Sequence, residues 1–585
     1  MAALCAGATL ALSGPAFGQA LCDPVMPTSE VTAGMTGTGW TVSRGRTRQA
    51  FSVEVLGVLK NGIGPDRDMI VVEASGPVID AAGGIWAGMS GSPIYIGGRL
   101  AGALAYGFSA TTHVAGLTPA QDMAKLLSLR TSAAAEPRTV PLSRNLARVV
   151  AETTGLPATS VDSLTQLRIP LSVSGLNARG MREVRDWAAK QDLAAIPYAG
   201  TSRSFAPPPL GPPPLPGDNF AAVASYGDVT MAGIGTTTWS CGGSALAFGH
   251  PYFYAGEERS GANAADAFAI ITDSVFGPFK FASIGETLGV VDQDRGAGLR
   301  ASLGQVPPTT PIRSTLTASD AGAFRRGSTD VVLDPLLPTA TFFHVISNID
   351  TTFDAIGRGS AALNWTIEGT RPDGSPWRLS HGNLIVSRGD IAVESAASVA
   401  FELDMLQFNP SEKVDVTSVR VEGRVERKVR QYTLTKVLLA KGAKARFKSV
   451  GRSVSVTPGT LLRVRSFLKP YEGGPTRLVD MRFRVPRRGQ AFGTLQIGGG
   501  SPTGCDGEEC EGSFQTFDEL LKALQDAPRN DVLSLRLRSG ESGRTAVQKG
   551  VPLDGVVLGI RSIELRPPGG GGGECCPPPT SVGGG

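Results

Sequence analysis

Hydrophobic and polar residues alternate with a period of two along much of the chain, which predicts short β-strands. The alternation is clear at 51–56 and 69–73. A hairpin is indicated at 94–106, where a Gly-Gly turn separates two apolar runs. The alternation returns between 400 and 500 with turn residues at intervals, and this predicts a β-sandwich. We therefore expect a mainly β protein.

Helix signals are few. A capping box with proline at the first helical position predicts that a helix begins at Thr118, and a second helix is expected at 181–190. A third is expected at 514–527, capped by Thr516 and Glu519. The apolar run 341–346 is interpreted as a strand.

Length and composition fit a large protein rich in strands and turns. The 585 residues allow three or four domains, and Gly 75 with Pro 41 favours turns over long helices. The net charge of +4 gives no basis for a nucleic-acid partner. No later segment has about 18 unbroken apolar residues, so we expect a mature chain without a membrane span. The oligomeric state is left open.

The first twenty residues resemble the later part of a secretory signal, with cleavage expected after Ala20. We therefore expect a secreted, envelope or periplasmic protein. Of the seven cysteines, Cys505 and Cys510 are a candidate disulfide loop, and Cys241 is interpreted as a turn residue. Cys575-Cys576 are expected to pair between chains or to remain irregular.

The run Gly88-Met89-Ser90-Gly91-Ser92-Pro93 carries the strongest chemical signal, because G-x-S-G-x-P is the form found around the nucleophile of chymotrypsin-like serine peptidases. Its glycines allow a tight turn in which backbone N–H groups face an oxyanion. Ser90 is the candidate nucleophile. The expected donors are the N–H groups of Gly88 or Met89 and of Ser90. A Gly/Ser-rich turn without chemistry is the alternative.

The choice of a general base is narrow, because the chain has only 4 histidines. His250 is the candidate, since Gly249 and Pro251 restrict its backbone and a neutral imidazole can accept a seryl proton. The other three, in a turn, a strand and a loop, are interpreted as surface or structural residues: His113, His344 and His381. No histidine pair has metal-ligand spacing, so we expect neither a metal nor a cofactor.

Three blocks together resemble the SpoIVB family of serine peptidases: GGIWAGMSGSPIYIGGRLAGALAYGF around Ser90, LAFGHP around His250, and LGVVDQDR from residue 288. The resemblance covers roughly the first 310 residues. It implies a chymotrypsin-like double β-barrel with the two catalytic groups in the cleft between barrels. In that family the histidine precedes the serine, so here the half-sites are in permuted order, which the geometry of a triad allows.

The acid of a triad is not identified by the sequence. The position that aligns with the family's aspartate is Ser75. Asp80 and Asp228 are equal candidates, Glu73 lies on the preceding predicted strand, and a serine–histidine dyad stays open.

These observations predict a secreted serine endopeptidase that acts on a protein or peptide through an acyl-enzyme on Ser90. The alternative is a noncatalytic envelope scaffold or peptide-binding protein that keeps a degenerate site. The resemblance and the local composition together give this domain order: signal 1–20, serine-bearing barrel unit 21–134, helical insert and Pro-rich linker 135–217, histidine-bearing barrel unit 218–318, β-rich connecting domain 319–400, β-sandwich 401–500, small α+β segment 501–567, and a disordered Gly/Pro tail 568–585.

Overall fold

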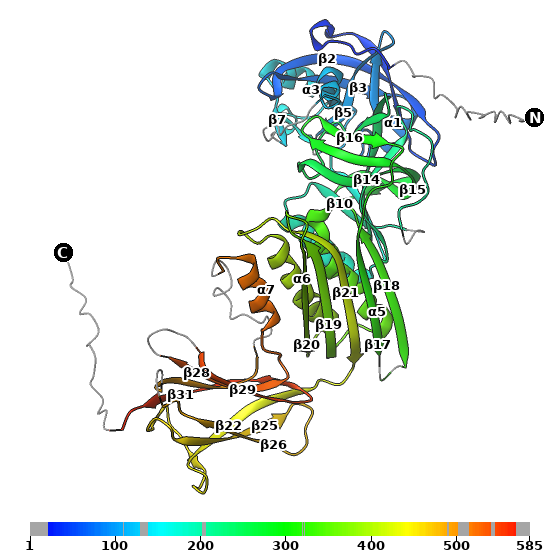
Figure 1. Ribbon diagram of the computed structural model, residues 1–585. Coiled ribbons are helices and arrows are strands. Elements are labelled where there is room, and N and C mark those ends of the chain that lie inside the picture. The colour runs from blue at the N-terminus through cyan, green and yellow to red at the C-terminus, as the bar shows by residue number, and fades with distance from the viewer. Residues whose placement is uncertain are drawn as a thin grey trace, which may run out of the picture. The chain divides into compact units, whose positions relative to one another are not determined.

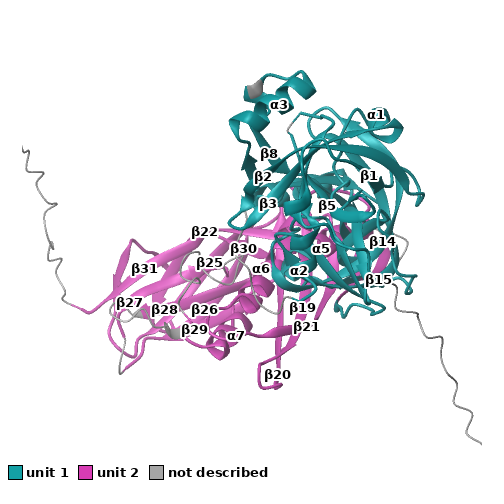
Figure 2. Ribbon diagram, turned by 90° about the horizontal axis from the view of Figure 1, so that it is seen from above, with its two compact units in different colours: residues 1–310, 329–340 teal, residues 311–328, 341–585 magenta. Residues whose placement is uncertain are grey.

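The computed structural model describes residues 22–108, 110–128, 138–201, 206–318, 320, 322–487, 491–500, 514–539 and 545–568. The chain forms two compact units, coloured separately in Figure 2. The first contains the residues up to 310 together with 329–340, and the second contains 311–328 and the residues from 341 onward. Strands dominate both units, so the prediction of a mainly β protein is confirmed (Figure 1).

Six antiparallel strands close into a barrel in the first unit. They follow the order β4-β1-β2-β3-β6-β5, and β5 pairs back to β4. The alternating residues of 51–56 explain this barrel, because Phe51, Val53 and Val55 are buried between exposed neighbours. The strands are β1 (Thr36–Thr41), β2 (Gln49–Gly64), β3 (Arg67–Ser75), β4 (Pro93–Ile96), β5 (Arg99–Gly107) and β6 (Val114–Pro119).

A second closed barrel follows in the same unit. Its six antiparallel strands have the order β12-β13-β16-β15-β14-β11, and β11 pairs back to β12. The predicted chymotrypsin-like double barrel is thereby confirmed, with the serine motif in the first barrel. The strands are β11 (Asn219–Gly227), β12 (Thr230–Cys241), β13 (Ser244–Ala247), β14 (Gly256–Asp273), β15 (Gly277–Arg295) and β16 (Gly298–Leu303).

Further elements surround the two barrels. The helix after Thr118 exists as α2, but Thr118 does not cap it, because its hydroxyl donates to the Gly249 carbonyl instead. The helix expected at 181–190 lies within α4. The elements are η1 (Thr28–Glu30), α1 (Pro77–Ala82), α2 (Ala120–Lys125), β7 (Thr139–Pro141), α3 (Arg144–Thr154), η2 (Ala158–Ser160), β8 (Ser163–Gln166), β9 (Ile169–Ser174), α4 (Ala178–Lys190) and β10 (Ala195–Ala199).

The Pro-rich run is attached to the second barrel. The Gly211 N–H donates to the Thr287 carbonyl at 2.8 Å, and the Thr287 hydroxyl donates to the Pro208 carbonyl at 2.6 Å. These bonds fix the run along β15, so this part of the expected linker is not a free spacer.

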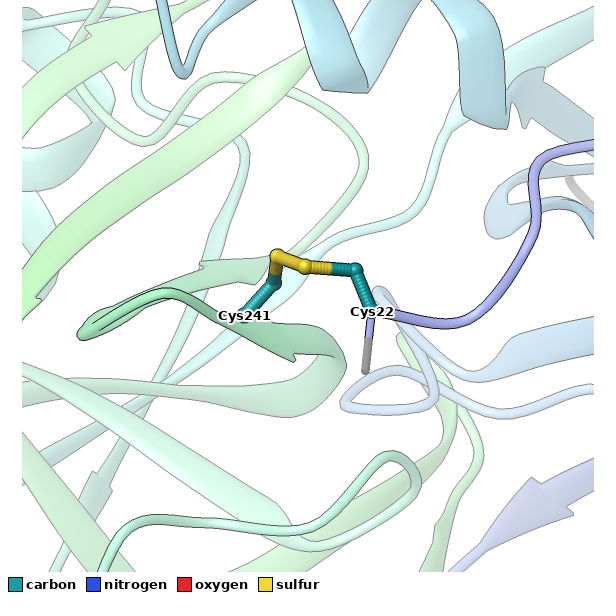
Figure 3. The surroundings of a disulfide bond; sticks show 2 residues. All are labelled: Cys22 and Cys241. Atoms are coloured by element: carbon teal, nitrogen blue, oxygen red, sulfur yellow. A yellow bond between two sulfur atoms is a disulfide. The ribbon is translucent and has the colours of Figure 1, made fainter. Parts of the chain in front are cut away.

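A disulfide between Cys22 and Cys241 joins the start of the described chain to the end of β12 (Figure 3). Their Cα atoms are 5.1 Å apart, and 219 positions separate them in the sequence. The interpretation of Cys241 as a simple turn residue was therefore wrong. Cys505, Cys510, Cys575 and Cys576 lie outside the described residues, as do the predicted signal and most of the Gly/Pro tail.

The second unit begins with a layered α/β region. Strand β17 runs parallel to β21, which pairs with β19, and α6 packs on β19 and β20. His344 lies in helix α5, so the predicted strand at 341–346 was wrong, and His381 lies in β20 and not in a loop. The elements are β17 (Thr310–Ala318), β18 (Ala323–Val331), α5 (Leu337–Phe353), β19 (Gly359–Thr370), β20 (Pro376–Ser387), α6 (Ile391–Gln407) and β21 (Asp415–Glu426). The short η3 (Asp334–Leu336), between β18 and α5, belongs to the first unit.

Two sheets packed face to face follow, and they confirm the predicted β-sandwich. Their shared core contains Val464 and Leu468 from one sheet and Leu495, Leu535 and Ile563 from the other. The sandwich extends to β31, beyond the predicted end at residue 500. Helix α7 is capped by Thr516 as expected. The elements are β22 (Gln431–Lys441), β23 (Lys448–Ser449), β24 (Ser453–Ser455), β25 (Leu461–Pro470), β26 (Arg477–Arg484), β27 (Gly493–Gly498), α7 (Phe517–Gln525), β28 (Val532–Ser539), β29 (Thr545–Pro552), β30 (Val556–Leu558) and β31 (Ile560–Arg566).

Among the described helices, none combines the length and the hydropathy that a membrane crossing requires.

Candidate active site

Ser90 lies in the turn between α1 and β4, at the entrance to the hairpin of β4 and β5. Gly88 and Gly91 both have a φ of +96°, which an L side chain rarely adopts. A Cβ on Gly91 would stand 2.0 Å from the Thr236 carbonyl oxygen and 2.6 Å from the Phe248 nitrogen. The motif's second glycine is therefore required by a close approach between the first barrel and the second.

Two threonines of β12 hold the serine turn from the other side. The Thr236 N–H donates to the Ser90 carbonyl at 2.8 Å, and its hydroxyl donates to the Gly88 carbonyl at 3.0 Å. The Thr238 hydroxyl donates to the Gly91 carbonyl at 2.8 Å. These two threonines were not among the predicted site residues, although three consecutive threonines, 236–238, are a visible signal in the sequence.

His250 follows β13 in a loop with an unusual backbone. Phe248 has a φ of +69° and Tyr254 a φ of +61°, and such conformations cost about 1–3 kcal/mol each for residues other than glycine. Packing stabilises this backbone: the fully buried Phe248 ring contacts the rings of Phe220 and Tyr252. The Thr118 hydroxyl of β6 also binds the Gly249 carbonyl at 2.5 Å.

Ser90 and His250 lie within hydrogen-bond distance of each other. His250 Nε2 lies 2.8 Å from Ser90 Oγ, and His250 Nδ1 lies 2.8 Å from the Pro251 carbonyl oxygen. A carbonyl oxygen can only accept, so Nδ1 carries the proton. In a neutral ring Nε2 is then unprotonated and accepts the hydrogen of the serine hydroxyl.

Burial keeps this histidine neutral. It lowers the pKa of His250 to about 4, and the bond to the Pro251 carbonyl only partly opposes the shift. Near pH 7 the ring is therefore a neutral acceptor, which is the protonation state that a general base requires.

No carboxylate among the described residues binds the imidazole of His250 directly. The ring's two hydrogen bonds go to Ser90 and Pro251, so neither candidate acid is bonded to it. Asp80 lies 3.3 Å from His113 Nε2 instead, and Asp228 occupies the turn between β11 and β12. Within the described residues, His250 therefore forms a dyad with Ser90.

Two backbone N–H groups beside Ser90 have no hydrogen-bond acceptor among the described residues, those of Gly88 and of Ser90 itself. The Met89 N–H is occupied, because it donates to the Trp86 carbonyl at 3.2 Å, and the Met89 side chain is fully buried. Of the expected oxyanion donors, Gly88 and Ser90 thus have N–H groups available for a ligand, and Met89 does not.

A buried lysine adjoins the turn. Lys280 Nζ donates to Asn219 Oδ1 at 2.8 Å and to the Thr236 hydroxyl at 3.3 Å, and its Cβ and Cδ lie beside Gly88. Its side chain is fully buried, and desolvation lowers its pKa to about 7. Lys280 was not predicted as a site residue, because no sequence motif surrounds it.

The site is nearly closed. Ser90 and His250 are each 1% exposed, and a pocket of about 210 Å³ reaches His250 from the side of Pro251, Tyr252 and Phe253. A substrate carbonyl therefore reaches Ser90 only if neighbouring residues move. Among the described residues, no group of three or more His, Cys, Asp or Glu side chains could hold a metal ion.

Comparison with known proteins gives one match, to the part of the chain that contains Ser90. Residues 19–117 match the model of the SpoIVB peptidase S55 family. No curated protein and no solved structure matches the chain. The matched segment contains Ser90 with its turn and ends before His250. The predicted family resemblance is confirmed on this segment.

Proposed function

We propose that this protein is a serine endopeptidase with Ser90 as nucleophile and His250 as general base, because the segment around Ser90 matches the SpoIVB peptidase S55 family model. The observation that carries the proposal is the 2.8 Å contact between Ser90 Oγ and an imidazole nitrogen whose tautomer is set to accept a proton.

The reaction follows from this geometry. Ser90 Oγ attacks the scissile carbonyl carbon while its proton passes to His250 Nε2. The oxyanion accepts hydrogen bonds from the N–H groups of Gly88 and Ser90. His250 then gives the proton to the leaving amine, the C–N bond breaks, and an acyl-enzyme remains. His250 deprotonates a water molecule, which attacks the ester carbonyl carbon. His250 then returns that proton to Ser90 Oγ as the C–O bond to the serine breaks, and the new carboxylic acid leaves and ionises to its carboxylate.

We also propose that the protein works in an oxidising compartment, secreted or in the cell envelope. The disulfide between Cys22 and Cys241 supports this, because such bonds persist in oxidising surroundings. The apolar character of residues 1–20 agrees with it. Thiol alkylation of the protein as isolated, with and without prior reduction, is the test, and two thiols labelled before reduction at these positions would contradict the proposal.

Labelling with a fluorophosphonate probe tests the peptidase directly. The wild type should form a covalent adduct on Ser90, and Ser90→Ala and His250→Ala should not. Ser92→Ala is the matched control, because the Ser92 hydroxyl is buried in the same turn and has no hydrogen-bond partner among the residues that the structure describes. A folded wild type that stays unlabelled, or labelling that survives Ser90→Ala, would overturn the proposal.

A second function has one observation in its favour. The near-complete burial of Ser90 and His250 also suits a noncatalytic peptide-binding protein that keeps the barrels and lacks turnover. In that case peptide binding persists in Ser90→Ala and the probe never reacts.

A further inference from the structure

We propose that Asp294 is a positioning residue for this reaction, and that it acts on His250 through the peptide group between Pro251 and Tyr252. The inference rests on the proposed function. In this proposal Asp294 is the carboxylate that the Ser90–His250 dyad lacks. One backbone amide lies between this carboxylate and the imidazole.

The contact geometry carries the argument. Asp294 Oδ1 accepts the Tyr252 N–H at 2.8 Å, and Oδ2 accepts the Phe253 N–H at 2.6 Å and the Ala255 N–H at 3.4 Å. The carboxylate is fully buried at the end of β15. The carboxylate therefore accepts hydrogen bonds from backbone N–H groups along the loop that follows His250.

One of those groups belongs to the peptide that binds the histidine. The Pro251 carbonyl and the Tyr252 N–H lie on the same planar peptide, and in a trans peptide they point in opposite directions. When Asp294 holds the N–H on one side, the carbonyl is aimed at the opposite side, where His250 Nδ1 lies 2.8 Å away. Asp294 thus determines the orientation of the His250 imidazole through one rigid, planar peptide group.

The same chain of bonds has an electronic consequence. A negative charge accepting the N–H polarises the peptide, and this makes its carbonyl a better acceptor for Nδ1–H. The imidazolium that forms when Ser90 attacks is stabilised by that carbonyl. A neutral group at position 294 would retain the shape but weaken the effect.

The loop needs such a support. Tyr254, inside the segment that Asp294 binds, has a φ of +61°. Residues that keep a left-handed conformation without being glycine persist only where surrounding contacts impose it. Burial raises the pKa of Asp294 to about 6, and four backbone N–H groups, including that of Tyr254, partly oppose this rise by binding the carboxylate.

Titratable neighbours make the effect dependent on pH. Burial raises the pKa of Asp294, and it raises that of Glu258 on β14 further, because Glu258 also faces the Asp294 charge. Tyr252 and Tyr254 lie in the loop, and Arg67 and Arg295 act on Tyr254. As the pH falls, Asp294 takes up a proton before His250, whose pKa is about 4. The acid limb of activity should therefore follow Asp294.

Asp294→Asn, with Asp292→Asn as control, tests the proposal. Asp292 lies on the same strand, but it binds Arg300 at 2.7 Å and Ser302 at 2.6 Å. Replacing a triad aspartate that binds histidine directly costs about 10⁴-fold in rate, so an effect through one peptide should be smaller, about 10- to 10³-fold. Asp294→Asn should lower the rate of fluorophosphonate labelling by this factor. It should also shift the pH at which labelling falls on acidification down toward the pKa of His250. Asp292→Asn should leave both within about twofold.

A second readout does not need catalysis. The chain has 4 histidines, so the Nδ1–H proton of His250 can be assigned by NMR with His250→Gln. In the wild type this signal should be downfield and slow to exchange, and it should be lost on acidification before the ring itself titrates. Asp294→Asn should shift it upfield and speed its exchange.

The outcomes separate the two proposals. If Asp294→Asn folds, labels at the wild-type rate and keeps the wild-type Nδ1–H signal, the role of Asp294 is refuted while the peptidase stands. If the wild type never labels, the peptidase fails, and the NMR signal alone decides on Asp294. If Asp294→Asn does not fold, the wild-type titration decides: a signal that persists until the ring protonates overturns the role.

Discussion

Replacing Gly91 with alanine should destabilise the first unit because the two barrels approach each other at this glycine. The added Cβ would lie 2.0 Å from the Thr236 carbonyl oxygen and 2.6 Å from the Phe248 nitrogen. Both atoms belong to the backbone of the second barrel. Neither can therefore relieve the clash by a change of rotamer, as a side chain could. The Thr236 N–H bond to the Ser90 carbonyl at 2.8 Å would be disturbed at the same time.

Two costs add in this variant. A left-handed conformation costs an alanine roughly 1–2 kcal/mol. Forcing extra volume into a packed interior typically costs a further amount of about 1–3 kcal/mol. Gly97, in the turn between β4 and β5, has a φ of +56° and open space around its Cβ position, so alanine there incurs only the first cost. We expect Gly91→Ala to lose about 2–5 kcal/mol of unfolding free energy and Gly97→Ala about 1–2 kcal/mol.

Urea unfolding, followed by tryptophan fluorescence, measures the free energy of unfolding of the wild type and of the two variants. The chain has 6 tryptophans, and Trp86 lies buried four residues before Ser90, so the signal reports on this region. Fluorophosphonate labelling should be lost in Gly91→Ala and retained in Gly97→Ala. If the two variants differ by less than about 1 kcal/mol, the close approach does not control stability and the reasoning is refuted.

Three other perturbations give separate tests. Cys22→Ser opens a loop of 219 residues and should cost about 5 kcal/mol by the loop-entropy estimate, measured by urea unfolding without reductant; no change would mean that the bond does not form. Burial lowers the pKa of Lys280 to about 7, so the unfolded state binds more protons above that pH and stability should rise from pH 7 to pH 10; Lys280→Met should abolish this rise in the same assay. Thr236→Val leaves the Gly88 carbonyl unpaired and should cost about 1–3 kcal/mol, whereas Thr237→Val, whose buried hydroxyl has no partner within the described part of the chain, should cost nothing or stabilise; equal losses would contradict the assignment.

The nucleophile and the base could be predicted because their requirements are local. Ser90 and His250 each sit between residues that fix an unusual backbone, and such residues can be recognised in a short window of sequence. The double barrel could be predicted through the family resemblance, because alternation alone indicates strands and not their order.

The carboxylate could not be predicted in this way. Asp294 lies 42 positions beyond the amide it binds and touches no ring atom of His250, so no spacing rule connects them. Asp80 and Asp228 were nearer to the motifs in sequence, but His250 bonds to neither.

The helix at His344 was missed for a general reason. A short apolar run such as 341–346 fits a buried strand and a buried helix equally well. The distinguishing residues lie outside the run: Asp334 and Pro335 begin the preceding helical turn, and Asn348 lies one turn after His344 and donates to its carbonyl at 2.9 Å.

The bond between Cys22 and Cys241 closes the intervening chain into a covalent ring that contains Ser90 and the Pro-rich run, with His250 nine residues outside it. A single backbone cut between positions 207 and 216 would therefore not divide the protein. The two pieces would migrate together on a denaturing gel without reductant and separate only after reduction. A nicked chain could keep its serine and its histidine in contact, so an intact band is no evidence of an intact backbone.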